Sequence, residues 1–367
     1  MLVAMLTSSP AVVAPVRAVA LLMTMASKGQ PLPAPLASVT FAVREESGEL
    51  VTPTGTVRMR TYVPEGAPGA PGLVVVHGVH RLGVDEPRLQ AFARAIAGAG
   101  VTVLTPEAKE LADFRIDAAS IGTIGAAADR LSALTGRSAV GVMGMSFAGG
   151  LSVLAAADPV AGRHIGFVVS VGGHHDLARV LGFFARSEIP APDGVWKVHA
   201  HDYGVLVVAY RYAEDFFPPA DVEIAKDTLR TWLWGDKGAA ETRAKAMSPA
   251  GQAKMRLFFD QREDVLAPEL LAIAERRKDA ARPVSPSSVI DRVRVPVFLL
   301  HGEQDDVIPS SEARWIDAEL PSTTPRTLLV TPTLKHVELV GTPTTRQKLD
   351  LAWFMSGVLQ AALNEPR

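Results

Sequence analysis

A serine surrounded by small residues is the first candidate for chemistry in this chain. Ser146 lies in the stretch Gly144-Met-Ser-Phe-Ala148, directly after the apolar run 139–143. A nucleophilic serine on a sharp turn between a strand and a helix needs small residues two positions before and two positions after it. Gly144 and Ala148 meet that need, although the usual pattern has glycine in the second place. The stretch therefore predicts a nucleophile turn, with an ordinary strand-to-helix junction as the alternative.

A serine hydroxyl needs a base at neutral pH, and the base needs a group that orients it. Asp305 follows the buried run Val295–Leu300 and a His-Gly turn, and His336 comes after the next apolar run. Catalytic groups in α/β sheets lie beyond the carboxyl ends of strands. We therefore expect Ser146 as nucleophile, His336 as base and a carboxylate beyond the earlier strand as the acid, for which Asp305, Asp306 and Glu303 are candidates. Asp176, beyond another strand, is the competing acid.

A second glycine turn lies upstream, where His77-Gly78-Val79 follows the strand-like run Leu73-Val-Val-Val76. Glycine lets the backbone turn so that the next amide faces the sheet edge. That amide and the amide after the serine can together bind the oxyanion of a tetrahedral intermediate. The predicted donors are the backbone N–H groups of Val79 and Phe147.

Three further side chains are predicted to line a substrate pocket. They are His80 beside the oxyanion loop, His175 at a strand end and Trp232 in an aromatic-rich segment. The run His174-His175-Asp176 contains residue types that bind metals, so a metal site is an alternative interpretation. Adjacent histidines point in different directions, however, and the chain has no His-Glu-x-x-His motif. We therefore expect no metal and no cofactor.

The elements that must position these residues alternate along the chain. Short apolar runs bounded by turn residues predict strands, and apolar residues at helical spacing predict helices. The predicted strands are 39–44, 56–63, 73–76, 101–104, 140–143, 167–171, 295–300 and 326–330, and the predicted helices are 87–97, 118–134, 147–157, 311–320 and 344–363. This alternation predicts a mostly parallel sheet with helices on both faces.

The alternation stops within residues 176–285, which hold about half of the aromatic residues of the chain. Helical stretches replace the strands there. We therefore expect a catalytic domain built from residues 38–175 and 286–367, with residues 176–285 inserted as a helical cap. Some of the inserted aromatic side chains are expected to line an apolar pocket.

Residues 1–37 form a third, mostly apolar segment. The run 11–26 is interrupted by Arg17 and is too short for a membrane span. The first ten residues carry no charge, unlike the start of a secretory signal, although Thr24-Met-Ala26 is a weak match to a cleavage site. We expect a helix that docks on the body, and a location that leans towards the cytoplasm.

Composition excludes several classes of protein. The 367 residues carry a net charge of −2 with no cluster of Lys and Arg, so no nucleic-acid partner is expected. The chain has no cysteine, which excludes disulfides, thiolate metal sites and a cysteine nucleophile. Self-association into a homo-oligomer stays open.

Four motifs, taken together and in this order, resemble the α/β-hydrolase superfamily over roughly residues 56–363. They are His77-Gly78, Gly-Met-Ser146-Phe-Ala, His-Gly-Glu-Gln-Asp305-Asp-Val-Ile-Pro and the late His336. The resemblance to dienelactone-hydrolase-like and lipase-like esterases implies a serine carboxylesterase with an inserted cap. The spacing of Asp305 after His301-Gly302 matches this family, which implies that Asp305 is the acid. Its substrate would be a small ester with an apolar acyl or alcohol group.

Two groups of alternatives stay open. Lipases, thioesterases, lactonases and acyltransferases use the same three residues. From another class, a catalytically silent hydrolase fold can serve as a binding module, because a fold does not by itself imply a function.

Overall fold

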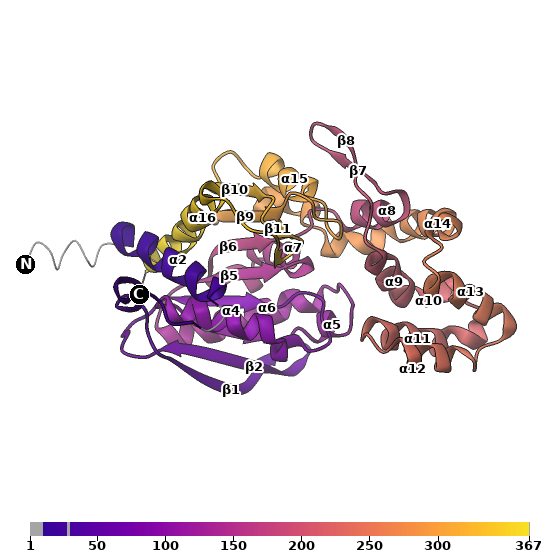
Figure 1. The fold of residues 1–367 in the computed structure, drawn as a ribbon, viewed down its shortest axis with the longest axis horizontal. Helices are drawn as coiled ribbons and strands as arrows, with labels where there is room; N and C mark the ends of the chain where they lie inside the picture. Colours follow the sequence, from indigo (N-terminus) through magenta and orange to yellow (C-terminus); the bar gives the residue numbers. More distant parts are fainter. Residues whose placement is uncertain (1–9, 28–29, 367) are drawn as a thin grey trace, which may run out of the picture.

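The computed structural model of the protein describes residues 10–27 and 30–366. Its centre is an eight-stranded sheet in the order β1-β2-β4-β3-β5-β6-β9-β10 (Figure 1). The strands are β1 (Val43–Thr52), β2 (Gly55–Pro64), β3 (Gly72–Val76), β4 (Thr102–Pro106), β5 (Val140–Met145), β6 (Ile165–Val171), β9 (Val297–Gly302) and β10 (Arg326–Thr331). β2 pairs antiparallel with both β1 and β4, and the remaining pairs are parallel. The predicted mostly parallel sheet is therefore confirmed.

Each buried strand contributes side chains to two separate apolar layers. In β3, Leu73 and Val75 belong to one core cluster, whereas Val74 and Val76 belong to the other. Successive side chains of a strand point to opposite faces, so a continuous apolar run marks a strand that is covered on both sides. The sequence of β3 thus requires helices on both faces of the sheet.

One face is covered by α2 (Pro10–Ala26), α4 (Pro87–Gly98) and α16 (Thr345–Asn364), whose apolar residues join the cluster of Leu73. The other face is covered by α6 (Ala119–Thr135), α7 (Phe147–Ala157) and α15 (Ser311–Glu319), whose apolar residues join the cluster of Val74. The helices on both faces are thus as predicted. The short helices α3 (Ala34–Ala37) and α5 (Lys109–Ala112) lie in connections.

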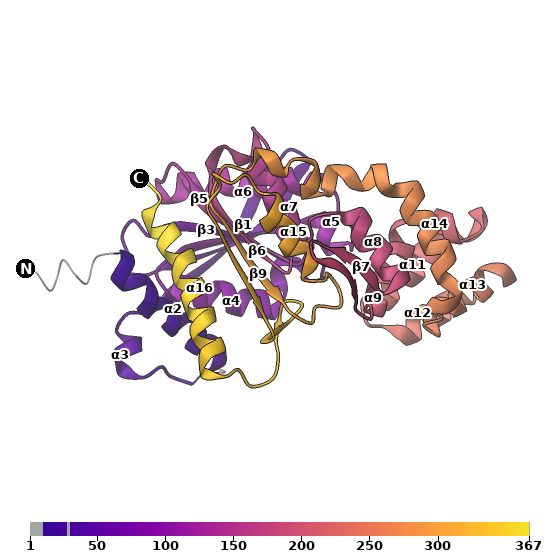
Figure 2. The same ribbon diagram turned by 90° about the horizontal axis from the view of Figure 1, so that it is seen from above.

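The helix α2 and the helix α16 lie side by side, although they come from the two ends of the chain (Figures 1 and 2). Ala14, Ala18 and Leu21 of α2 are buried. Among the helices that the structure describes, none combines the length and the apolar character needed to cross a membrane. The first nine residues, part of the predicted N-terminal segment, lie outside the described residues.

The segment between β6 and β9 projects from one end of the sheet (Figures 1 and 2). Its helices are α8 (Leu177–Arg186), α9 (Asp202–Arg211), α10 (Ala213–Phe216), α11 (Val222–Leu233), α12 (Lys237–Ala244), α13 (Pro249–Phe259) and α14 (Glu263–Ala281). It also holds a hairpin of β7 (Glu188–Ala191) and β8 (Gly194–Lys197), which the sequence analysis did not predict. Strands of four residues are too short to show a clear alternation, and only the turn Pro-Asp-Gly194 marks them.

The first strand is the largest departure from the predicted element boundaries. The sequence predicts a strand over 39–44, but β1 begins at Val43 and continues to Thr52. Most of its side chains are exposed, because β1 lies at the edge of the sheet and pairs only with β2. An exposed edge strand carries charged residues, so it lacks the apolar run by which strands are recognised.

Candidate active site

Ser146 lies at the junction of β5 and α7 with φ 57° and ψ −135°. A positive φ is unusual for a residue with a side chain. The turn is tight: a Cβ at Gly144 would lie 2.1 Å from the carbonyl oxygen of Ala148. Ala148 itself is fully buried, so the structure accommodates its methyl group in place of the usual glycine. The predicted strand, turn and helix are all present.

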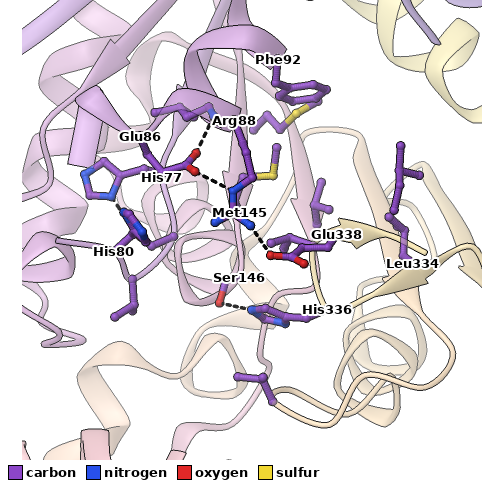
Figure 3. Close-up of a pocket in the computed structure, with 18 of the residues that line it drawn as sticks. His77, His80, Glu86, Arg88, Phe92, Met145, Ser146, Leu334, His336 and Glu338 are labelled. Atoms are coloured by element: carbon purple, nitrogen blue, oxygen red, sulfur yellow. Dashed lines mark hydrogen bonds and ion pairs between the residues drawn. The ribbon is translucent and has the colours of Figure 1, made fainter. Parts of the chain in front are cut away.

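His336 lies in the turn of a small hairpin, between β11 (Leu334–Lys335) and β12 (Glu338–Leu339), with φ 55°. Its Nε2 is 2.8 Å from Oγ of Ser146, and its Nδ1 is 2.9 Å from Oδ2 of Asp305. Figure 3 shows the contact with the serine. The structure thus brings together the three residues that the sequence analysis selected. The hairpin was not predicted, because strands of two residues have no detectable pattern.

Asp305 is almost completely buried, and every oxygen of its carboxylate has a partner. Oδ1 accepts hydrogen bonds from the backbone N–H groups of Val307 and Ile308, both at 2.9 Å. Oδ2 faces His336 and lies 3.3 Å from Nε2 of His301.

Burial by itself raises the pKa of the Asp305 carboxyl, but other effects outweigh it. The electrostatic interaction with His336 and the hydrogen bonds from His301 and His336 together hold this pKa below its usual range. The group is therefore a carboxylate at neutral pH. A carboxylate at Nδ1 favours the tautomer with a proton on Nδ1, which leaves the lone pair of Nε2 facing Ser146.

The backbone after β3 approaches the serine closely. A Cβ at Gly78 would lie 3.1 Å from Cβ of Ser146, so a side chain at this position would crowd the site. Within the described residues, the N–H groups of Val79 and Phe147 donate no hydrogen bond. Backbone amides without a partner are the kind of donor that an oxyanion hole requires.

His77 holds this loop in place and does not reach the serine. Its Nδ1 donates to the carbonyl oxygen of Gly78 at 2.7 Å, and its Nε2 accepts a hydrogen bond from the N–H of Ala108 at 3.0 Å. Burial lowers the pKa of His77, so the ring is neutral. One donor and one acceptor are what a neutral imidazole offers.

A cavity of about 770 Å³ begins at Ser146 and His336. Figure 3 shows part of its lining, including His80, as the sequence analysis predicts for that residue. Arg88 bridges two carboxylates here: Nε is 2.6 Å from Glu86, and the guanidinium also contacts Glu338. The segment between β6 and β9 contributes only a few groups to the described lining, which are His201, Tyr203, Leu233, Trp234 and Gly235.

The prediction that His175 and Trp232 line the pocket is wrong for this cavity. His175 is buried, where Nδ1 accepts a hydrogen bond from Arg179 at 3.0 Å. Trp232 stacks on Phe259 with ring centroids 4.2 Å apart. Its neighbours Leu233 and Trp234 reach the cavity instead, because successive residues of a helix point about 100° apart.

The competing acid Asp176 has a structural position in the described chain. Its carboxylate caps α8 by accepting a hydrogen bond from the N–H of Arg179 at 3.0 Å, and it also accepts one from Oγ of Ser287 at 3.1 Å. His174 donates from Nε2 to the carbonyl oxygen of Val284 at 2.7 Å. These residues therefore point to separate partners and do not converge on one metal position.

A second group of metal-ligand residue types lies in the segment between β6 and β9. His199, Asp202 and Glu263 bring ligand atoms within 4.8 Å of one another. Burial, followed by the influence of Asp202, raises the pKa of Glu263 to about 7. Exposed histidine and carboxylate groups often lie this close without binding a metal, so this group carries no assignment.

No known family model matches the chain, and no curated protein sequence matches it. Solved structures share its fold. A puromycin hydrolase is 14% identical with a TM-score of 0.50, and the match covers 90% of this chain and 40% of that one. A 2,6-dihydroxy-pseudo-oxynicotine hydrolase is 18% identical with a TM-score of 0.49, over 89% of this chain and 70% of that one. A dienelactone hydrolase from Anabaena variabilis is 14% identical with a TM-score of 0.44, over 89% and 99%.

The likeness to the puromycin hydrolase and the sheet described above show that the chain has the α/β-hydrolase fold. This chain spans 40% of the length of the puromycin hydrolase, so the likeness does not extend to that whole protein. At such low sequence identities, a structural likeness shows a shared fold but does not show a shared activity.

Proposed function

We propose that this protein is a serine hydrolase that cleaves carboxylic esters through an acyl-enzyme on Ser146. The observation that carries the proposal is the continuous chain of hydrogen bonds from Asp305 through His336 to Ser146, at 2.9 and 2.8 Å. This chain has the geometry that activates a serine, in which an acid orients the base and the base contacts the nucleophile.

The reaction would proceed in two halves. Nε2 of His336 takes the proton as Oγ of Ser146 bonds to the ester carbonyl carbon, and the amides of Val79 and Phe147 hold the resulting oxyanion. The C–O bond then breaks, and the alcohol leaves with the proton from His336. Water next attacks the acyl-enzyme and gives a proton to His336. The bond between the acyl carbon and Oγ then breaks, the acid leaves, and His336 returns the proton to Oγ of Ser146. Throughout, Asp305 stabilises the charged imidazole.

The substrate would be uncharged and largely apolar. The charged side chains in the cavity lining are Arg81, Arg88, Glu86 and Glu338, whose formal charges cancel. Because no excess of positive charge lines the cavity, nothing there favours an anionic substrate over a neutral ester.

We further propose that residues 38–175 and 286–367 form the catalytic domain and that the helical segment 176–285 acts as its cap. Support comes from Tyr203, Leu233 and Trp234, which lie in this segment and line the cavity. A cap that covers a site excludes water and positions a substrate.

The silent-fold alternative predicts a broken or misaligned triad, and the hydrogen-bonded side chains argue against it. The test compares p-nitrophenyl acetate hydrolysis by wild type, Ser146→Ala and the control Ser138→Ala, an exposed serine. We expect Ser146→Ala to lose at least about 10³-fold in kcat/KM and the control to keep wild-type activity. A fluorophosphonate should label wild type at Ser146 and leave Ser146→Ala unlabelled. Full activity in Ser146→Ala would overturn the proposal, and no turnover or labelling of wild type would favour a binding module.

A further inference from the structure

The cavity at Ser146 continues along one face of the central sheet. Its sheet-side lining consists of Met143 and Met145 of β5, Val169 and Val171 of β6, and Leu300 of β9. All of these belong to, or pack on, the apolar layer under α2, α4 and α16. Alternate residues of a strand lie about 7 Å apart on one face. Because Met143 and Val169 line the cavity as well as Met145 and Val171, the cavity runs at least that far below the catalytic edge.

The opposite wall of this region comes from three helices that are far apart in the sequence. Its residues are all apolar, namely Leu21, Leu22 and Met25 of α2, Leu89 and Phe92 of α4, and Leu351, Phe354 and Met355 of α16. We call the region between these helices and the sheet the hydrocarbon arm. A polar group placed there would lose its hydrogen bonds to water without replacement, so the arm selects an apolar occupant.

Two of the charged lining residues, Arg88 and Glu338, mark the surface end of the cavity. The side chains of Arg88 and Glu338 are 62% and 61% exposed, and they pair with each other. The residues of the arm are buried or half-buried. An occupant with its ester at Ser146 would therefore place a purely apolar portion between the sheet and the helices.

The shape of the arm favours a flexible chain. It is a space between two packed layers, and four methionines line it: Met25, Met143, Met145 and Met355. Methionine side chains are unbranched and adapt to the contour of an apolar ligand. The whole cavity of about 770 Å³ lies within the size range of pockets that enclose small-molecule ligands, about 300–1,000 Å³.

From these observations we propose that the substrate of this protein is a long-chain ester whose linear hydrocarbon chain occupies the hydrocarbon arm. The proposal rests on the proposed ester hydrolysis and adds its substrate class. It also gives the N-terminal helix α2 a role in specificity, because α2 forms part of the wall.

The first experiment measures kcat/KM along two series of esters. One series holds p-nitrophenol constant and lengthens the acyl chain, and the other holds acetate constant and lengthens a linear alcohol. In one of the series we expect about a fourfold gain for each added methylene until the arm is full. The series that responds identifies whether the acyl or the alcohol chain enters. A flat or falling profile in both series would overturn the inference.

The second experiment fills the arm with a larger side chain. Met25 lines the arm, whereas Met23, on the same helix, is 38% exposed and does not line it. We expect Met25→Trp to lower the ratio of long-chain to acetate kcat/KM by at least tenfold. The matched control Met23→Trp should leave this ratio unchanged. Equal effects of the two variants would contradict the assignment, and thermal unfolding of both checks that they fold.

A third measurement needs no turnover. Parinaric acid, a linear fatty acid that fluoresces in apolar surroundings, should bind Ser146→Ala and should bind the double variant with Met25→Trp at least tenfold more weakly. Binding without ester turnover by wild type would overturn the proposed hydrolysis alone. Turnover of acetate with neither length dependence nor parinaric acid binding would overturn the hydrocarbon arm alone.

Discussion

Asp305 and His336 are joined by a 2.9 Å hydrogen bond although they follow different strands. Asp305 follows β9, and His336 lies in the hairpin after β10. β9 and β10 are parallel neighbours, with Thr331 opposite Gly302, so their carboxyl ends lie side by side. A Cβ at Gly302 would lie 2.5 Å from the carbonyl oxygen of Leu334, so the hairpin packs directly on this backbone. His336 is thus positioned by strand pairing and by a close backbone approach.

Replacing the acid should impair catalysis much more than folding. We expect Asp305→Asn to lower kcat by about 10³- to 10⁴-fold, because an amide no longer favours the tautomer that leaves Nε2 free. The matched control is Asp306→Asn, whose carboxylate lies 2.9 Å from Lys335 and not at His336. The control should keep kcat within about threefold, as a partly exposed ion pair contributes little. Similar losses in both variants would argue against Asp305 as the orienting acid.

A methyl group at Gly144 should disrupt the nucleophile turn. Its Cβ would lie 2.1 Å from a backbone oxygen, so the turn must shift. We expect Gly144→Ala to lower the free energy of unfolding by about 1–3 kcal/mol, as overpacking does, and to reduce kcat as well. Ala148→Gly, which restores the usual motif, should cost about 1 kcal/mol or less and keep its activity. Urea unfolding and p-nitrophenyl acetate kinetics test both; a Gly144→Ala protein with wild-type kcat would contradict the account.

A buried ion pair anchors the start of the segment 176–285 to α15. The Glu312 side chain is fully buried, accepts hydrogen bonds from the N–H groups of His175 and Asp176 at 2.8 Å, and lies 2.6 Å from Nε of Arg179. Glu312→Gln leaves the Arg179 charge without its buried partner. We therefore expect the free energy of unfolding to fall by about 3–5 kcal/mol.

The control for this pair is Asp260→Asn, which removes the exposed pair with Arg256. The free energy of unfolding should then stay close to that of the wild type, because solvent screens an exposed pair. If urea unfolding shows an equally small change in the free energy of unfolding for Glu312→Gln, the pair of Glu312 and Arg179 stabilises the protein no more than an ordinary surface contact.

His175 should make the fold sensitive to acid. Burial, followed by the charge of Arg179, lowers the pKa of His175 from 6.5 to about 3. Between these two values the unfolded chain binds a proton that the folded protein does not bind. Stability is therefore lost as the pH falls from about 6.5 towards 3, by up to ~1.4 kcal/mol per pH unit from this one group.

His175→Gln removes that group, so its free energy of unfolding should depend less steeply on pH over this window. Urea unfolding at pH 7, 6, 5 and 4 measures the slope for both proteins. Parallel slopes would mean that His175 is protonated in the folded state.

The sequence by itself determined the features that depend on neighbouring residues. Gly144 and Ala148 around Ser146 specified a tight turn, and the apolar run of β3 specified a strand buried on both faces. Asp305 and His336 were predicted because parallel strands carry functional groups at one edge of the sheet, which restricts where partners can lie. Their meeting at hydrogen-bond distance is a fact of the three-dimensional structure.

The tertiary structure alone decided which side chains line the cavity. The aromatic residues of the insertion suggested Trp232, and a strand end suggested His175, but both pack elsewhere. The walls come instead from α2 and α16, at opposite ends of the chain. Periodicity identifies the apolar face of a helix. Which strands that face meets depends on the packing of distant segments, and no local pattern in the sequence encodes it.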